Sequence, residues 1–297
     1  MAPIKLTTKE QIVQLLNDFD NFIFDCDGVI WLGDHPIPGS IETIKLLQDL
    51  QKTIIFVTNN STKSRNQYTE KFTKLGLSVT KDEVFGSAYA AATYLDKIIQ
   101  FPKDEKIWVM GEKGIIEELN DLGYETLGGE DERLNVKFHK DTTPFLPIDP
   151  KVGAVIAGLD TNVNYHRLAI TLQYLQQPNV KFIATNIDST FPSKGLILPG
   201  AGSIIETVAY ASGREPIPCG KPSQNMLDAI VKDKNLDRSR TIMIGDRLNT
   251  DIKFGNDGNL GGTLLVLSGI ETEENALKHG TPKYYSDVLG VIYDLYK

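Results

Sequence analysis

Residues 21–31, Asn-Phe-Ile-Phe-Asp-Cys-Asp-Gly-Val-Ile-Trp, decide the fold of this 297-residue chain. The apolar run Phe22–Phe24 is closed by polar residues and a glycine, which is typical of a buried strand in a parallel sheet. In open sheets of this kind, ligands bind at the carboxyl ends of the strands. Asp25 and Asp27 therefore stand where we expect a reactive site.

Two carboxylates one residue apart are costly to bury unless a cation or a reaction uses them. An acidic turn and a fragment of a calcium-binding loop are the alternative interpretations. The calcium loop needs glycine at its sixth position and further oxygen ligands. Here the glycine is the fourth residue, and Val29, Ile30 and Trp31 follow it. The motif by itself leaves a chemical and a structural role open.

The composition argues against several classes of partner. The chain has 31 Lys and Arg against 39 Asp and Glu, which leaves a formal charge of -8. Nucleic acid and anionic membranes bind surfaces with clustered positive charge, so neither is expected as the main partner. No stretch approaches the ~18 apolar residues of a membrane span. The two cysteines, Cys26 and Cys219, are too few for a disulfide framework and fit a reducing compartment. We therefore expect a cytoplasmic protein, with the nucleus as the alternative compartment.

The first third of the chain alternates between helix and strand patterns. Around the strand at 22–24, apolar spacing predicts strands at 53–57 and 83–85 and helices at 8–19, 40–50, 64–75 and 87–99. This β-α-β order predicts a doubly wound, Rossmann-like parallel sheet with right-handed crossovers.

The middle of the chain repeats this alternation on a smaller scale. Strands are expected at 107–110, 152–157 and 181–184, and helices at 112–122 and 165–175. Pro102 marks the break before them, and Pro199-Gly200-Ala201-Gly202 is the candidate return linker. We therefore expect a smaller α/β unit at 102–199, inserted into a core formed by 1–101 and 200–297.

The last part of the chain completes that core. Helices are expected at 203–211, 223–232 and 287–296, and strands at 217–219, 241–244 and 263–267. Three strands of the predicted core then end in reactive polar groups, which are Asp25 with Asp27, Thr58 with Asn59, and Asp246 with Asp251. Lys221 adds a cation in a Gly-Lys-Pro turn.

The motifs DCDGV (25–29), TNN (58–60), GKP (220–222) and GDRLNTD (245–251) together resemble the four ordered motifs of the haloacid dehalogenase superfamily of phosphatases. The resemblance covers nearly the whole chain. The mid-chain insertion, TNIDSTFP (185–192) and LPGAGSIIETV (198–208) are similar to the branch that includes 4-nitrophenylphosphatases, phosphoglycolate phosphatases and pyridoxal phosphatases.

The roles that this resemblance implies agree with the chemistry of the residues. A carboxylate that attacks phosphorus forms an aspartyl-phosphate and divides one difficult step into two. Asp25, at the strand end, is the expected nucleophile. Asp27 is the expected general acid towards the leaving alkoxide, and then the general base for the hydrolytic water.

The same resemblance implies a magnesium site and a phosphate site. Carboxylates that face a phosphate dianion need a hard divalent counter-ion with oxygen ligands. The expected Mg²⁺ ligands are Asp25, the backbone carbonyl of Asp27, and Asp246, with Asp251 orienting this set. The expected phosphate-binding groups are the Thr58 hydroxyl, the Asn59 backbone, the neighbouring Asn60, and Lys221.

The insertion corresponds in the family to a C2-type cap, and the loop 185–192 to its specificity element. The candidate specificity residues are Asn186, Asp188 and Phe191. Pyridoxal phosphatases have a histidine where this chain has Phe191, so the expected substrate is a small ester such as 2-phosphoglycolate, with 4-nitrophenyl phosphate as an artificial one. The resemblance also suggests that two copies pair through the cap.

Several alternatives stay open at this point. Within the family, these are a pyridoxal phosphate phosphatase, a phosphoprotein phosphatase and a phosphomutase. Outside it, a phospho-acceptor signalling module would keep its aspartyl-phosphate. The family also includes enzymes that remove halogen from carbon. The resemblance implies that their first motif has a single aspartate and that they use no metal, so the second aspartate here, Asp27, argues against that reaction. Cys26 is interpreted as a small packing residue, with a redox role as the alternative.

Overall fold

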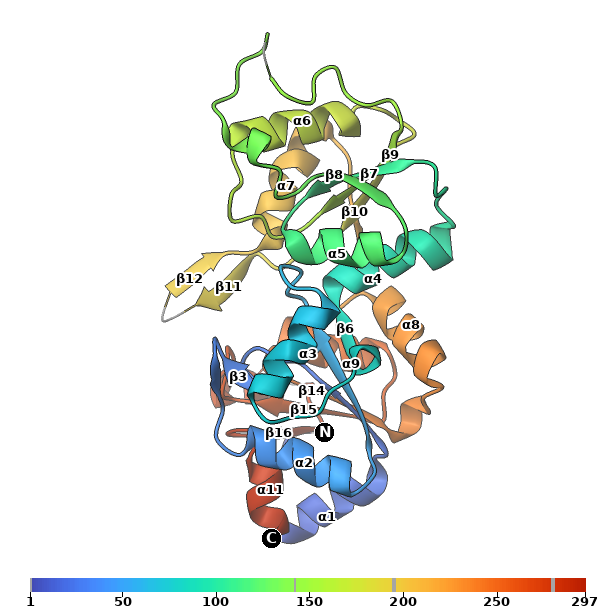
Figure 1. Ribbon diagram of the computed structural model, residues 1–297. Helices are drawn as coiled ribbons and strands as arrows, with labels where there is room; N and C mark the ends of the chain where they lie inside the picture. Colours follow the sequence, from blue (N-terminus) through green and yellow to red (C-terminus); the bar gives the residue numbers. More distant parts are fainter. Residues whose placement is uncertain (1, 142, 194–195, 279–280) are drawn as a thin grey trace. The chain divides into compact units, whose positions relative to one another are not determined.

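The computed structural model describes residues 2–141, 143–193, 196–278 and 281–297 of the chain (Figure 1). By their internal packing, the residues form two compact units. The first unit consists of Met1–Thr58, Thr69–Phe85 and Lys221–Lys297. The second consists of Asn59–Tyr68 and Gly86–Gly220. Each unit contains a parallel sheet with helices packed on it, so the predicted α/β class is confirmed.

The first unit is built on a seven-stranded sheet in the order β1-β16-β15-β14-β2-β5-β6. The strands span β1 (Ile4–Lys5), β2 (Asn21–Phe24), β5 (Thr53–Thr58), β6 (Val84–Gly86), β14 (Thr241–Gly245), β15 (Gly262–Val266) and β16 (Tyr284–Ser286). β2 pairs in parallel with β14 on one side and with β5 on the other. The three strands that carry the sequence motifs are therefore immediate neighbours, with their carboxyl ends at one edge of the sheet.

Burial explains why the apolar runs form the centre of this sheet. All four residues of β2 are buried, as expected for a strand that is covered on both faces. The rings of Phe24 and Phe56 lie 6.0 Å apart, and Phe56 in turn packs on Phe72 at 4.3 Å. The helices of this unit are α1 (Lys9–Asp18), α2 (Ser40–Asp49), the C-terminal part of α3 (Arg65–Lys74), α8 (Gln224–Lys234), α9 (Lys253–Asp257), α10 (Glu273–Lys278) and α11 (Val291–Tyr296).

The second unit has a five-stranded sheet in the order β13-β10-β9-β7-β8. Its strands are β7 (Lys106–Met110), β8 (Glu125–Gly128), β9 (Val152–Ala157), β10 (Lys181–Ala184) and β13 (Ile217–Pro218). Its helices are α4 (Ser87–Thr93), α5 (Lys113–Asp121), α6 (Tyr165–Leu175) and α7 (Ala201–Ser212), and α4 continues as a π-helical segment, Tyr94–Ile99. All four neighbouring strand pairs of this sheet are parallel.

Alternation along the strands gives this sheet two apolar faces. Side chains of successive strand residues point to opposite sides. Trp108 and Val155 therefore join a core with α6 and α7, whereas Ile107 and Ile156 join a core with α4 and α5. Figure 1 shows the two pairs of helices on opposite faces of the sheet.

The borders of the second unit differ from the expected limits of 102 and 199. The difference at the C-terminal side arises because α7 packs on this sheet through Ile205 and Val208, and β13 pairs in parallel with β10. On the other side, α4 contributes Ala88 and Ala92 to the same unit. The prolines used to place the limits lie inside the unit, and Pro199 is the last residue of β12.

Five short strand regions were not predicted, and the first of them is β1, at the start of the chain. β8 (Glu125–Gly128) ends at the first residue of the Gly128-Gly129 pair, and β16 precedes the last helix, which begins only at Val291. β3 (Trp31–Leu32) pairs with β4 (His35–Pro36), and β11 (Thr190–Ser193) pairs antiparallel with β12 (Leu196–Pro199). The predicted specificity loop, 185–192, therefore ends inside a strand.

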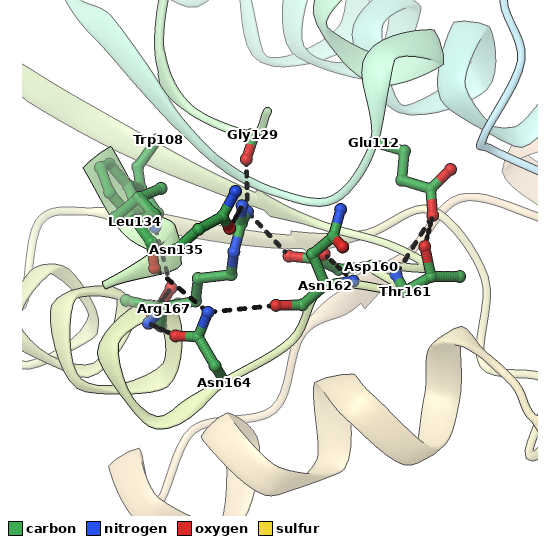
Figure 2. A network of polar contacts seen from close by, with 11 residues as sticks. Trp108, Glu112, Gly129, Leu134, Asn135, Asp160, Thr161, Asn162, Asn164 and Arg167 are labelled. Atoms are coloured by element: carbon green, nitrogen blue, oxygen red, sulfur yellow. Dashed lines mark hydrogen bonds and ion pairs between the residues drawn. The ribbon is translucent and has the colours of Figure 1, made fainter. Parts of the chain in front are cut away.

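A buried arginine connects several loops of the second unit (Figure 2). The Arg167 guanidinium lies 3.2 Å from the Asp160 carboxylate, donates to Asn135 Oδ1 at 3.0 Å, and also donates to the Gly129 carbonyl. Both members of the Arg167–Asp160 pair are almost completely buried. Losing one member of such a pair leaves an uncompensated charge in a dry interior.

Arg167→Met should therefore lower the free energy of unfolding of the second unit by about 3 kcal/mol or more, because Asp160 loses its partner in the interior. Arg133→Met is the matched control: Arg133 pairs with Asp131 in the same unit, but its side chain is 66% exposed, so a loss below about 1 kcal/mol is expected. Urea unfolding followed by circular dichroism measures both variants. Equal losses of unfolding free energy in the two variants would contradict a larger contribution of the buried pair to stability.

Candidate active site

Three carboxylates meet at the carboxyl ends of two neighbouring strands in the first unit. Asp25 follows β2, Asp246 follows β14, and Asp251 lies in the helical turn Leu248–Ile252. One oxygen from each side chain lies within 4.8 Å of the other two. Within the described ranges of the chain, this is the one group of acidic, histidine or cysteine side chains that is close enough to share an ion.

Lys221 lies inside this cluster. Its ammonium is 2.8 Å from Asp25 Oδ1 and 2.7 Å from Asp251 Oδ1, and it donates to the Val57 carbonyl at 3.0 Å. The Lys221 side chain is only 2% exposed. Lys221 therefore joins the ends of β2 and β5 and the turn after β14, which are the three predicted motif positions of this unit.

Burial shifts the pKa of the carboxylates upward. The pKa of Asp25 is well above its ordinary range because burial disfavours the charge, and Asp251 and Asp246 add repulsion to an effect that Lys221 partly offsets. The same causes, burial first and then Asp251, raise the pKa of Asp246 to about 7. Burial by itself lowers the pKa of Lys221, but the Asp25 and Asp251 carboxylates raise it overall. The cluster has a surplus of negative charge that favours a cation.

Backbone donors and close glycines fix the carboxylates. Asp246 Oδ2 accepts from Ile270 N at 2.9 Å. A Cβ placed on Gly28 would lie 2.5 Å from this Oδ2, and a Cβ on Gly269 would lie 1.9 Å from it. Gly28 also has a φ of +87°, which favours glycine. Only residues without a side chain leave room for Asp246 in this position.

Asp251 is fixed in a similar way. Its Oδ2 accepts from Asp246 N at 3.2 Å and from Arg247 N at 3.1 Å. A Cβ placed on Gly245 would lie 2.1 Å from the Cβ of Asp251. Asp251 is fully buried, which is unlike an ordinary charge on a helix surface. It thus holds both the turn after β14 and the Lys221 ammonium.

The donor set suits a hard divalent cation. Carboxylate oxygens at neighbouring strand ends are the ligand type that Mg²⁺ takes in phosphate-processing sites, with water completing the shell. Three buried carboxylates face one ammonium, so a further positive charge would relieve their repulsion. The residues of this cluster therefore fit a metal ion.

Asp27 lies beside this cluster on the turn that follows β2. Its Oδ1 accepts from the indole Nε1 of Trp31 at 2.9 Å. Asp27 is partly exposed, whereas Cys26 is completely buried, and burial raises the pKa of the Cys26 thiol well above its usual range. A buried thiol with a raised pKa is a packing group, which argues against the redox alternative.

The predicted phosphate-binding residues fall in both units. Thr58 ends β5 in the first unit and is 1% exposed. Asn59 and Asn60 begin the second unit. There, the Asn59 carbonyl accepts from Ser87 Oγ and from Asn186 Nδ2, each at 2.7 Å. Asn60 Oδ1 accepts from the Thr62 amide at 3.0 Å and closes a local turn.

The predicted specificity residues behave differently from one another. Asp188 Oδ2 accepts from Asn59 Nδ2 at 3.0 Å, and Asp188 N donates to Asn186 Oδ1 at 3.0 Å. Asn186 and Asp188 therefore hold the Asn59 turn of the second unit. Phe191 lies on β11 opposite Leu198 of β12.

Some residues of this site were not identified from the sequence. Gly28 and Gly245 stand inside the recognised motifs, so their spacing to the aspartates was the available signal. Gly269 and Ser87 carry no local signal, because Gly269 reaches Asp246 in the first unit, and Ser87 reaches Asn59 in the second, only through the fold. In the sequence, Trp31 is an apolar residue without an oxygen ligand, and nothing there indicates its bond to Asp27.

Comparison with known proteins identifies the family. A model described as haloacid dehalogenase-like hydrolase matches residues 22–125, and a second, described as HAD-hydrolase-like, matches 218–291. The chain is 44% identical to a 4-nitrophenylphosphatase of Schizosaccharomyces pombe, with 96% of this chain and 97% of that protein covered. It is 43% identical to phosphoglycolate phosphatase 2 of Arabidopsis thaliana, with 99% of each chain covered.

A solved structure agrees with the sequence matches. The p-nitrophenyl phosphatase from Archaeoglobus fulgidus superimposes with a TM-score of 0.79 at 31% identity, and the match covers 93% of this chain and 99% of that one. Among the residues that the structure describes, no helix has both the length and the apolar character needed to cross a membrane. Together with the carboxylate cluster, these matches show that the chain belongs to the haloacid dehalogenase-like hydrolases, in the branch of the 4-nitrophenylphosphatases and phosphoglycolate phosphatases.

Proposed function

We propose that this protein is a Mg²⁺-dependent phosphatase that hydrolyses small phosphate monoesters through an aspartyl-phosphate on Asp25. The observation that carries the proposal is the meeting of Asp25, Asp246, Asp251 and Lys221 at adjacent strand ends. Phosphoryl transfer depends mainly on positioning and on neutralising the charge of the equatorial oxygens, and this cluster offers a fixed ammonium and a cation site for both.

In the first step, a carboxylate oxygen of Asp25 attacks phosphorus, and the bond from phosphorus to the leaving oxygen breaks. Asp27 gives its proton to that oxygen. In the second step, water attacks the aspartyl-phosphate, Asp27 takes up a proton from it, and the bond between phosphorus and Asp25 breaks. Inorganic phosphate leaves, and both carboxyl groups return to their starting states.

The cation would be held by Asp25, the Asp27 backbone carbonyl and Asp246, and would supply charge neutralisation for the phosphoryl group. Asp251 orients this set, because it holds the turn that carries Asp246 and pairs with Lys221. The Thr58 hydroxyl, the Asn59 backbone and the neighbouring Asn60 would bind phosphoryl oxygens. The bonds from Ser87 and Asn186 to the Asn59 carbonyl support a fixed geometry for this turn.

The proposed substrate is 2-phosphoglycolate or a similar small phosphorylated hydroxy acid. The two relatives described above are named for 4-nitrophenyl phosphate and phosphoglycolate. Phe191 has no ring nitrogen that could bind a pyridine ring, which argues against pyridoxal phosphate. We also propose that two copies associate through the second unit, and that the protein works in the cytoplasm, where its two buried, unpaired cysteines would stay reduced.

Asp25→Asn should reduce phosphatase activity by more than about a thousand-fold, because the amide is a poor nucleophile. Asp20→Asn is the matched control: Asp20 precedes the same strand at its other end and pairs with Arg240 and Lys52 at the surface. Its activity should remain within about twofold of the parent, as a surface pair contributes little. Release of phosphate from 4-nitrophenyl phosphate measures both variants, and an active Asp25→Asn would refute the nucleophile.

Without divalent cations, the free energy of unfolding should fall as the pH rises from about 4 to about 7, because the pKa of Asp246 is about 4 in the unfolded chain and about 7 in the folded protein. Mg²⁺ needs the deprotonated carboxylate, so it should raise the melting temperature more near pH 8 than near pH 5. Thermal unfolding in EDTA and in saturating Mg²⁺ measures this difference. Asp246→Asn should abolish the Mg²⁺ effect, and an unchanged effect would contradict the assigned ligand.

A panel of phosphate esters at fixed Mg²⁺ tests the substrate class. The value of kcat/KM should be at least about tenfold higher for 2-phosphoglycolate than for pyridoxal phosphate or a phosphoserine peptide, a ratio that a few specific contacts can supply. A preference for either of the latter two would overturn the proposed class and leave the Asp25 chemistry intact.

A further inference from the structure

The indole of Trp31 is hydrogen-bonded to the proposed general acid. Trp31 Nε1 donates to Asp27 Oδ1 at 2.9 Å. The tryptophan side chain is completely buried, whereas Asp27 is partly exposed. The bond therefore connects a rigid group of the core to a carboxyl group that reaches solvent.

The backbone between the two residues places them next to each other. Ile30 N donates to the Cys26 carbonyl at 2.9 Å, and Gly28 N donates to the Trp31 carbonyl at 2.8 Å. These bonds close a tight turn, which brings the side chain of Trp31 back beside that of Asp27, four residues earlier. The four-residue separation of Asp27 and Trp31 thus matches the length of this turn.

The indole ring is held by its neighbours in the first unit. The ring of Phe72 packs against it with centroids 5.0 Å apart. The Lys71 ammonium lies 4.0 Å from the centroid of the Trp31 ring and donates to the Gly33 carbonyl at 2.7 Å. Packing of this kind leaves the ring few orientations, so the direction of its N–H is fixed.

The chemistry of the indole favours one carboxyl oxygen over the other as the site of the proton. An indole nitrogen is a donor only. Asp27 Oδ1 is therefore the acceptor of this bond, and because the carbonyl oxygen of a carboxylic acid accepts better than its hydroxyl oxygen, the bond favours an acid form with the proton on Oδ2. A carboxyl group without this partner could be protonated on either oxygen and could rotate about its last bond.

We propose that Trp31 is a positioning residue for the proposed phosphatase reaction, and that it holds Asp27 so that Oδ2 delivers the proton to the leaving oxygen. This inference rests on the function proposed above. In this role, Trp31 affects only the protonation of the leaving group in the first step. It makes no contact with the substrate.

The other tryptophan of the chain supplies a matched comparison. Trp108 is also buried, and its Nε1 donates to Thr171 Oγ1 at 2.8 Å. This acceptor is a neutral hydroxyl in the core of the second unit, and it has no part in the proposed chemistry. Replacing either tryptophan by phenylalanine removes one N–H and part of one ring from a buried site.

The experiment compares two kinds of leaving group in the same preparation. An alkoxide, as in 2-phosphoglycolate or glycerol 3-phosphate, needs a proton from the general acid, whereas 4-nitrophenolate is a stable anion and leaves without one. In Trp31→Phe, the ratio of kcat/KM for the alkyl esters to kcat/KM for 4-nitrophenyl phosphate should fall about tenfold, as part of the 10²–10⁴-fold that a positioned general acid supplies. The ratio does not depend on the fraction of folded protein.

Two further variants complete the test. Trp108→Phe should leave the ratio unchanged, and Lys71→Met, which releases one side of the Trp31 ring, should shift it in the same direction as Trp31→Phe but by less. An equal loss for alkyl and aryl esters in Trp31→Phe would overturn the inference and leave the proposed function standing. Absence of Mg²⁺-dependent turnover in the parent protein would instead refute the proposed function itself.

Discussion

The interaction on which the site depends is the contact of one buried ammonium with two carboxylates. Lys221 lies between Asp25 and Asp251 and also bonds to the backbone at the end of β5. Without it, the buried carboxylates would repel one another and take up protons. Lys221 offsets only part of this repulsion, since the pKa values of Asp25 and Asp246 remain raised, and a divalent cation is expected to offset the rest. The parallel sheet supplies the geometry, since it aligns the strand ends at one edge.

Small residues are as important to this arrangement as charged ones. Asp246 fits between Gly28 and Gly269, and Asp251 lies against Gly245. These contacts leave each carboxylate only one position. The proposed chemistry thus requires glycine backbone close to the carboxylates. The packing of the whole core must provide this approach, because the motif residues alone do not.

Much of this could be predicted from the sequence, and the failures have physical reasons. The apolar runs at 22–24, 152–157 and 182–184 predict buried strands, and the structure confirms β2, β9 and β10 at these places. The meeting of Asp25 with Asp246 follows from the rule for strand ends, and the geometry agrees. The borders of the second unit differ from the expected ones because α7 packs on the sheet of that unit, and local sequence does not say which sheet a helix joins. Gly269 and Ser87 act through tertiary contact and leave no local pattern.

The pairing of Trp31 with Asp27 also gives the protein a built-in optical reporter. The chain has two tryptophans, and the second lies in the core of the other unit. In a chain that keeps only Trp31, all indole emission would come from a ring whose N–H touches the proposed acid. Changes in ionisation or occupancy around Asp27 would then alter the fluorescence of the unlabelled protein, and reaction intermediates could be followed in real time without a dye.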